Sequence, residues 1–148
     1  MDRNGQLTFG DDPLLIGINE VYQLLEEGNF SEAIKKVDNL MNINPDYPGL
    51  AEGYRTAKFC ATRANEIESL VKGKQTADFL MREWEDFKTY SANNKMIDSA
   101  AYHSAMKFIF FKASEHYKIA FKEQESTTDN FDLLLNLGMC FLILEEYK

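Results

Sequence analysis

Few side chains in this sequence belong to types that could take part in catalysis or metal binding. They are two histidines, His103 and His116, two cysteines, Cys60 and Cys140, and acidic pairs such as Glu26–Glu27 and Glu145–Glu146. A catalytic zinc site would space its histidines as in H-E-x-x-H, and an acyl-transfer enzyme would carry a G-x-S-x-G turn. The sequence contains neither pattern and no glycine-rich phosphate loop. We therefore predict no catalytic residue, no metal site and no cofactor, and interpret the acidic pairs as solvated helix ends.

The composition is that of an ordinary globular protein. Of its 148 residues, 45% are hydrophobic and 27% are charged, which suits one domain with a core. Cys60 and Cys140 match no metal or redox spacing, so we interpret them as buried free thiols in a reducing compartment. The N-terminus lacks the apolar core of a signal peptide, and no run approaches the roughly 18 apolar residues that span a bilayer. We predict a cytoplasmic protein that does not enter the membrane.

The chain is acidic, with a formal net charge of −8 and an isoelectric point near 4.8. An acidic surface repels the phosphate backbone of nucleic acids and attracts basic segments of other proteins. We therefore predict no nucleic-acid partner. The expected partner is another protein, which contributes a peptide or helix that is partly apolar and basic.

Apolar residues recur at steps of three and four along most of the chain, which is the periodicity of amphipathic helices. No stretch shows the sustained alternation of a β-strand, and prolines occur only at positions 13, 45 and 48. We predict an all-α protein with about seven helices in successive antiparallel pairs. The main helical segments are expected at residues 13–27, 29–44, 48–71, 76–90, 96–124 and 131–147.

The turn between the first two segments is marked by several residues. Gly28 should end the first helix, because glycine tolerates the left-handed conformation that a helix C-terminus needs. Asn29 can then cap the second helix, with Glu32 reaching back as in a capping box. This helix should stop before Pro45, since the residue preceding a proline is disfavoured in the helical conformation.

Residue types at this turn recur elsewhere in the chain. The first copy of the pattern consists of Gly28, Phe30, Ala33 and Pro45, and its alanine-centred part recurs at Ala113, Tyr117 and Ala120. A different but related pattern near the end of the chain consists of Leu134, Leu137, Gly138, Phe141 and Tyr147. The first two resemble the second half of a tetratricopeptide repeat, a helix–turn–helix unit of 34 residues, and the last resembles its first half.

The resemblance implies a fold and a packing role for each of these residues. The fold is an α-solenoid of antiparallel helix pairs. The glycine at position 28 makes the turn, the aromatic at position 30 packs beneath it, and the alanine at position 33 lets two helices approach closely. Gly138 removes a side chain where a neighbouring helix crosses. Because Ala33 and Ala113 are 80 residues apart, where two repeats would span about 68, this array is divergent.

The predicted organisation is an N-terminal tail, residues 1–12, followed by a tetratricopeptide-like helical domain, residues 13–148. A repeat that breaks off between its two helices predicts that these residues are the N-terminal part of a longer array. The alternative is a natural terminus, at which the last helix caps the stack.

In tetratricopeptide arrays the first helices of successive pairs line a concave groove that holds a partner. When the groove-facing positions of the repeat are placed on this sequence by their spacing, they fall on Ile18, Tyr22 and Leu25 in the first copy and on Leu135, Met139 and Leu142 in the last. The alternative is that these side chains pack against the neighbouring pair.

The predicted function is that of a non-catalytic protein–protein interaction scaffold or adaptor that uses this groove. The alternative is a regulatory or oligomerisation module attached to an effector or enzyme domain beyond residue 148. Residues 133–144, LLLNLGMCFLIL, are apolar on every face except at Asn136. One neighbouring hairpin can cover only one side of such a helix, so we also predict a homodimer through it.

Overall fold

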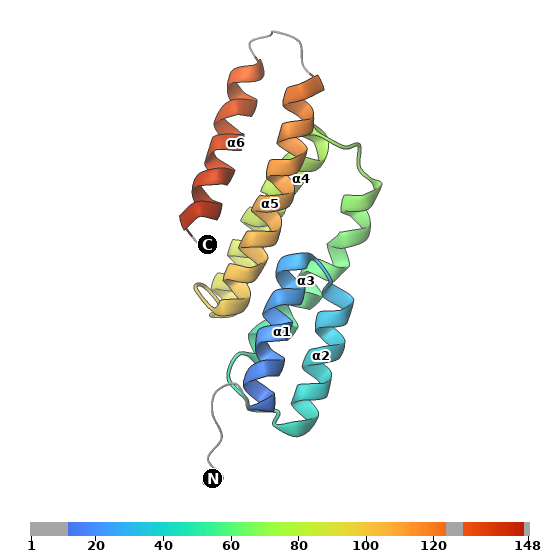
Figure 1. The fold of residues 1–148 in the computed structure, drawn as a ribbon, viewed down its shortest axis with the longest axis vertical. Coiled ribbons are helices and arrows are strands. Elements are labelled where there is room, and N and C mark those ends of the chain that lie inside the picture. The colour runs from blue at the N-terminus through green and yellow to red at the C-terminus, as the bar shows by residue number, and fades with distance from the viewer. Residues whose placement is uncertain (1–11, 124–128, 147–148) are drawn as a thin grey trace.

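The computed structural model describes residues 12–123 and 129–146, which form six α-helices (Figure 1). They are α1 (Pro13–Glu27), α2 (Phe30–Ile43), α3 (Leu50–Ser69), α4 (Lys74–Asn93), α5 (Ala100–Glu123) and α6 (Asp129–Glu146). The described ranges contain no strand, which confirms the all-α prediction, although they hold six helices where about seven were expected. The predicted tail lies outside them except for Asp12, whose carboxylate caps α1 by accepting from the Leu14 N–H. Tyr147 also lies outside them.

Helix α5 is the centre of the arrangement. It contacts α1, α3, α4 and α6, whereas α1 and α2 form a hairpin at one end of the molecule (Figure 1). As its sequence predicts, the middle of α5 is covered on several sides: Met106, Phe108, Ile109 and Phe110 are buried, and Phe111 is exposed. An apolar helix of this kind gains most from burial when other helices surround it.

The α1–α2 turn has the predicted limits but not the predicted cap. Gly28 adopts the left-handed conformation (φ 82°) and ends α1, and α2 ends at Ile43, before the exposed Pro45. Asn29 precedes α2, yet its side chain makes no capping bond and instead donates to the Glu27 carboxylate (3.3 Å). The capping box with Glu32 is therefore not formed.

Residues of this turn attach the first hairpin to α5. The Phe30 ring packs edge-on against Phe108, with 5.0 Å between ring centroids. A Cβ atom on Gly28 would lie 2.5 Å from Cε1 of Phe108, so the absence of a side chain lets the Phe108 ring approach the turn. Ala33 is fully buried in the same core.

The second alanine-centred pattern lies on the buried side of α5. Ala113, Tyr117 and Ala120 are all buried. The Tyr117 hydroxyl donates to the Asp78 carboxylate of α4 (3.2 Å), which satisfies the one polar group of the set. Burial, followed by the charge of Asp78, raises the pKa of Tyr117. This tyrosine therefore remains a neutral donor at physiological pH.

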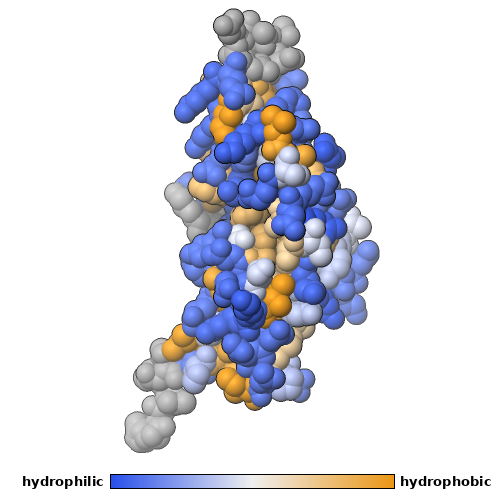
Figure 2. All heavy atoms as spheres, turned by 90° about the vertical axis from the view of Figure 1, so that its right-hand side faces the viewer, coloured by the Kyte–Doolittle hydropathy of each residue, from blue (hydrophilic) through white to orange (hydrophobic). Residues whose placement is uncertain are grey.

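Outside the core, one narrow side of the molecule is mostly polar. Figure 2 shows the side that lies at the right of Figure 1, and hydrophilic residues cover most of it, with hydrophobic ones in a narrow strip and in separate spots. Scattered apolar residues of this kind are normal on protein surfaces.

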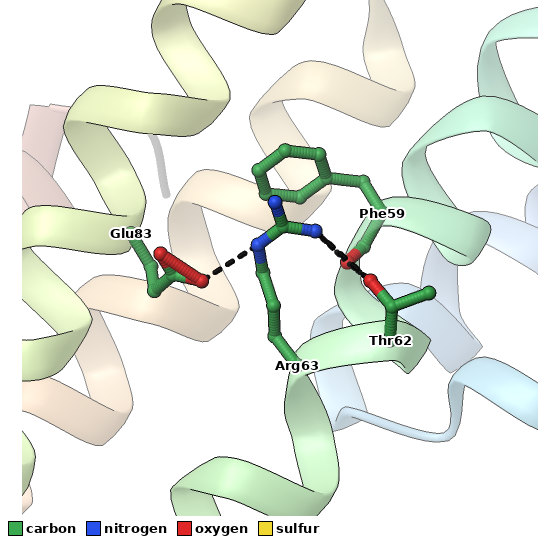
Figure 3. A network of polar contacts seen from close by, with 4 residues as sticks. All are labelled: Phe59, Thr62, Arg63 and Glu83. Carbon is green, nitrogen blue, oxygen red and sulfur yellow. Dashed lines mark hydrogen bonds and ion pairs between the residues drawn. The ribbon is translucent and has the colours of Figure 1, made fainter.

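Helices α3 and α4 share only a small contact area, and Arg63 of α3 spans it (Figure 3). Its Nε donates to Glu83 of α4 (2.6 Å), and its Nη1 donates to the Phe59 carbonyl and the Thr62 hydroxyl (2.9 Å each). The guanidinium also stacks 3.5 Å from the centroid of the Phe59 ring. Burial raises the pKa of Glu83 and the neighbouring Asp86 adds to this, while Arg63 opposes both.

We predict that Gly28→Ala destabilises the protein. A left-handed conformation costs an alanine about 1–2 kcal/mol, and the Phe108 ring must also move to make room. Gly138→Ala is the matched control, because that glycine lies inside a helix and an added methyl group would meet no neighbouring element among the described residues within 4 Å. The control should gain about 0.5–1 kcal/mol from helix propensity. Urea denaturation measures both, and equal effects would contradict the role assigned to Gly28.

We predict that Arg63→Met lowers the free energy of unfolding by about 1–3 kcal/mol at neutral pH, because the Glu83 carboxylate loses its cation in a shielded site. Without Arg63 the folded-state pKa of Glu83 rises further above its unfolded-state value. The folded state then favours protonated Glu83. The stability that this group contributes is therefore present below its unfolded-state pKa and is lost as pH rises through its folded-state pKa.

The deficit of Arg63→Met should therefore be smaller near pH 4 than near pH 7. Urea denaturation across this range measures it, and the double variant Arg63→Met/Glu83→Gln should not show the trend. A deficit that is independent of pH would exclude Glu83 as its cause.

Candidate interaction surface

Helix α6 packs against the rest of the molecule through one face only. Leu133 and Cys140 are buried, and Leu137 and Leu144 are half-buried against the same core. These positions follow one another at steps of four, three and four, which places them on a single helix face. Among the helices described, α6 contacts α5 alone and lies at the edge of the molecule (Figure 1).

The opposite face of α6 is apolar and has no neighbour among the described residues. We call it the α6 outer surface; it consists of Phe131, Leu134, Leu135, Gly138, Met139 and Leu142. Its five side chains are exposed, from 48% at Met139 to 73% at Leu142. Together with Asn136 these residues line a hollow of about 670 Å³. At 100° per residue, positions 131, 135, 138 and 142 lie directly opposite the face that contacts α5.

Gly138 lies in the middle of this surface, which corrects the prediction that it marks a helix crossing. Apart from its chain neighbours and the α6 backbone, no atom of the described residues lies within 4 Å of the position that its Cβ would occupy. The neighbour, α5, packs on the other side of α6 instead. Phe141 was expected in the same packing pattern but is 45% exposed, at the margin of the surface, where the Lys118 ammonium lies 5.2 Å from its ring centroid.

The charges of α6 are all negative. Its sequence contains no lysine or arginine, and Asp132, Glu145 and Glu146 are exposed near its two ends. The apolar centre of the α6 outer surface is thus flanked by carboxylates. Such a surface complements a partner with an apolar centre and basic flanks.

Three of the six groove residues predicted from sequence belong to the α6 outer surface. Leu135, Met139 and Leu142 are exposed as a groove position requires. Phe131 and Leu134 belong to the same surface but were not predicted as binding residues. The signal for them was present, since both lie in a helix that is apolar on nearly every face.

The other three groove residues lie elsewhere, and this corrects the predicted groove. Ile18 and Leu25 are in the core, 4% and 0% exposed, because α2, α3 and α5 all pack on α1. Tyr22 is half-buried beside Gly49, and burial, followed by the charge of Glu52, raises its pKa. Helices α1 and α6 do not contact each other within the described ranges, so the two sets do not form one site.

The nucleophilic side chains are held in unreactive forms. Burial raises the pKa of Cys60 to about 12 and that of Cys140 to about 11, so both thiols are protonated at neutral pH. In the part of the chain described, no three histidine, cysteine or acidic side chains gather in a way that could hold a metal ion. The helices described there also include none with the length and apolar character needed to cross a membrane.

Comparison with family models, curated proteins and solved structures gave no match to this chain.

The two faces of α6 should respond differently to truncation. Leu133→Ala opens a cavity against α5 and should cost about 2–5 kcal/mol. Leu142→Ala removes a side chain that is 73% exposed and should change the free energy of unfolding by no more than about 0.5 kcal/mol. Urea denaturation of both variants is the measurement. A large loss in Leu142→Ala would mean that the outer surface is buried in the folded protein.

Proposed function

We propose that this protein is a non-catalytic protein–protein interaction scaffold of the tetratricopeptide-like α-solenoid type. The observation that carries the proposal is the α6 outer surface, a contiguous apolar face that no described residue covers. An exposed apolar patch of this kind is typical of sites where another protein binds. The buried free thiols of Cys60 and Cys140 support a reducing, cytoplasmic location.

The shape of the surface suits a helix. Its central residues recur at steps of four, three and four, so they form a stripe along α6 that a second apolar stripe can match. Gly138 presents no side chain at the middle of this stripe. A partner helix can therefore bring its backbone close to α6 at that point, as small residues allow at helix crossings.

The negative charges at the two ends of α6 favour a partner with positive charges. A helix with an apolar stripe and lysine or arginine near its ends would place cations beside Asp132, Glu145 and Glu146. A second copy of α6 would bring carboxylates together in either orientation, because both ends of the helix are acidic. We therefore propose a basic amphipathic helix of another protein as the occupant, in preference to a homodimer.

The probe is a synthetic peptide of about 18 residues, the length of α6, that combines a leucine stripe with lysines at both ends and is labelled for fluorescence anisotropy. A matched peptide carries glutamates in place of the lysines. We expect the basic peptide to bind and the acidic peptide to bind at least about tenfold more weakly, which corresponds to about 1.4 kcal/mol. Leu135→Glu/Leu142→Glu should abolish binding of the basic peptide.

The control variant is Ile43→Glu/Val71→Glu, which places the same charges at two exposed apolar positions outside α6. It should bind the basic peptide like the unmodified protein. Equal binding of both peptides, or binding that survives Leu135→Glu/Leu142→Glu, would contradict the proposal. Sedimentation that shows a dimer lost in Leu135→Glu/Leu142→Glu would assign the surface to a second copy instead.

A further inference from the structure

A second concave site lies away from the α6 outer surface, where the end of α3, the α3–α4 loop and the last turns of α5 meet. Its volume is about 450 Å³. Apolar side chains form part of its wall, namely Ile67, Leu70 and Ile119. The charged residues that line it are Lys72, Lys112, Lys118, Lys122, Glu68 and Glu115, together with His116. Cavities of this size hold small organic molecules.

The cavity is positively charged in a protein that is negatively charged overall. Its four lysines and two glutamates give a net charge of 4 − 2 = +2, against −8 for the whole chain. Lys72, Lys112 and Lys122 have no carboxylate within 4.0 Å among the residues described. These ammonium groups are free to bind an anion.

His116 adds a hydrogen-bond donor to the same cavity. Nδ1 of His116 accepts a hydrogen bond from the Gly73 N–H (3.1 Å), so the neutral ring carries its proton on Nε2. Thr76, in the first turn of α4, also lines the cavity.

The loop that carries Lys72 is firmly positioned. Gly73 has φ 103° and ψ −135°, a conformation open almost only to glycine. The Thr76 hydroxyl donates to the Val71 carbonyl (2.7 Å), and the Val71 N–H donates to the Gln75 side chain (3.0 Å). The hydrogen bond from the Gly73 N–H to His116 attaches this loop to α5. Lys72 on the loop and Lys112 on α5 therefore line the same cavity.

The electrostatic field at His116 agrees with this charge distribution. Burial is the main cause that lowers the pKa of His116. Lys112 lowers it more than Glu115 raises it, and Lys72 lowers it more than Glu68 raises it. Lysines and glutamates from α3, the loop and α5 thus combine to a positive potential at the imidazole.

We propose that this cavity binds the phosphate monoester group of a small molecule. A phosphate monoester carries a charge of about −2 at neutral pH, which balances the net charge of +2 in the cavity. Lysine ammonium groups and the imidazole N–H are established donors to phosphate oxygens. The remaining volume and the apolar wall accommodate an organic body. The acidic remainder of the surface disfavours a nucleic acid as the source of the phosphate.

Phenyl phosphate is the probe, because it joins one phosphate monoester to an apolar ring. Its binding is measured by calorimetry, and the His116 ring is followed by NMR during pH titration at constant ionic strength. We expect saturable binding and a rise in the pKa of His116, since a dianion favours the imidazolium form. Benzenesulfonate, which has the same ring and a single charge, should bind at least about tenfold more weakly.

Lys72→Gln/Lys112→Gln should weaken phenyl phosphate binding by roughly tenfold or more. The matched control, Arg55→Gln/Lys95→Gln, removes the same charge at two exposed positions that do not line the cavity. An equal loss of phenyl phosphate binding in both double variants would show that only the net charge of the protein matters, and this would overturn the proposal. Absence of binding up to about 10 mM would also overturn it.

The two proposals can fail separately. Leu135→Glu/Leu142→Glu should leave phenyl phosphate binding unchanged, because neither residue lines this cavity. Lys72→Gln/Lys112→Gln should leave binding of the basic helical peptide unchanged for the corresponding reason. A protein that binds one probe and not the other therefore identifies which proposal is wrong.

Discussion

The whole structure depends on the burial of α5. Its side chains are apolar on nearly every side over residues 106–111, and burial of that surface requires helices from both halves of the chain. The neighbours are fitted to it individually. Phe30 of α2 meets Phe108, Trp84 of α4 meets Phe110 with 5.3 Å between ring centroids, and Asp78 of α4 receives the Tyr117 hydroxyl. Since the hydrophobic effect has no direction, these contacts set the angles at which the surrounding helices pack.

Helix α6 is also apolar on most sides, but packing against α5 buries only part of its surface. Both helices are apolar around most of their circumference, yet α5 is packed against helices on several sides and α6 against α5 alone among the described residues. On the face of α6 that contacts α5, Leu133 and Cys140 are as well buried as the rest of the core. The two sides of one helix therefore differ: one is buried and contributes to stability, and the other is exposed and, under the proposed function, serves recognition.

Features that depend on residues close in sequence could be predicted well. The ends of α1 and α2 follow from Gly28 and Pro45, and the burial around Phe108 follows from the apolar run that contains it. The capping box failed for a local reason as well, since the Asn29 amide bonds to Glu27 instead of to the backbone.

Features that depend on distant segments could not be predicted in the same way. Ile18 and Leu25 are covered partly by α5, which begins more than 70 residues later. In α6 the periodicity is too weak to say which face meets a neighbour, so Gly138 was assigned to a crossing that lies on the other side. Gly17 allows the close approach of α1 to Leu40, although it belongs to no recognised pattern. The cavity at His116 joins α3, the α3–α4 loop and α5, and sequence spacing does not reveal such a meeting point.

The reactivity of Cys140 reports on the separation of α6 from α5. Its sulfur is sealed between α6 and α5, and its raised pKa keeps it unreactive while the two helices are in contact. An alkylating reagent can reach it only when α6 separates from α5 or when the whole molecule unfolds. Cys60, buried in α3, distinguishes these two events, because it is shielded by a different part of the core. The ratio of the two alkylation rates therefore measures how independently α6 detaches.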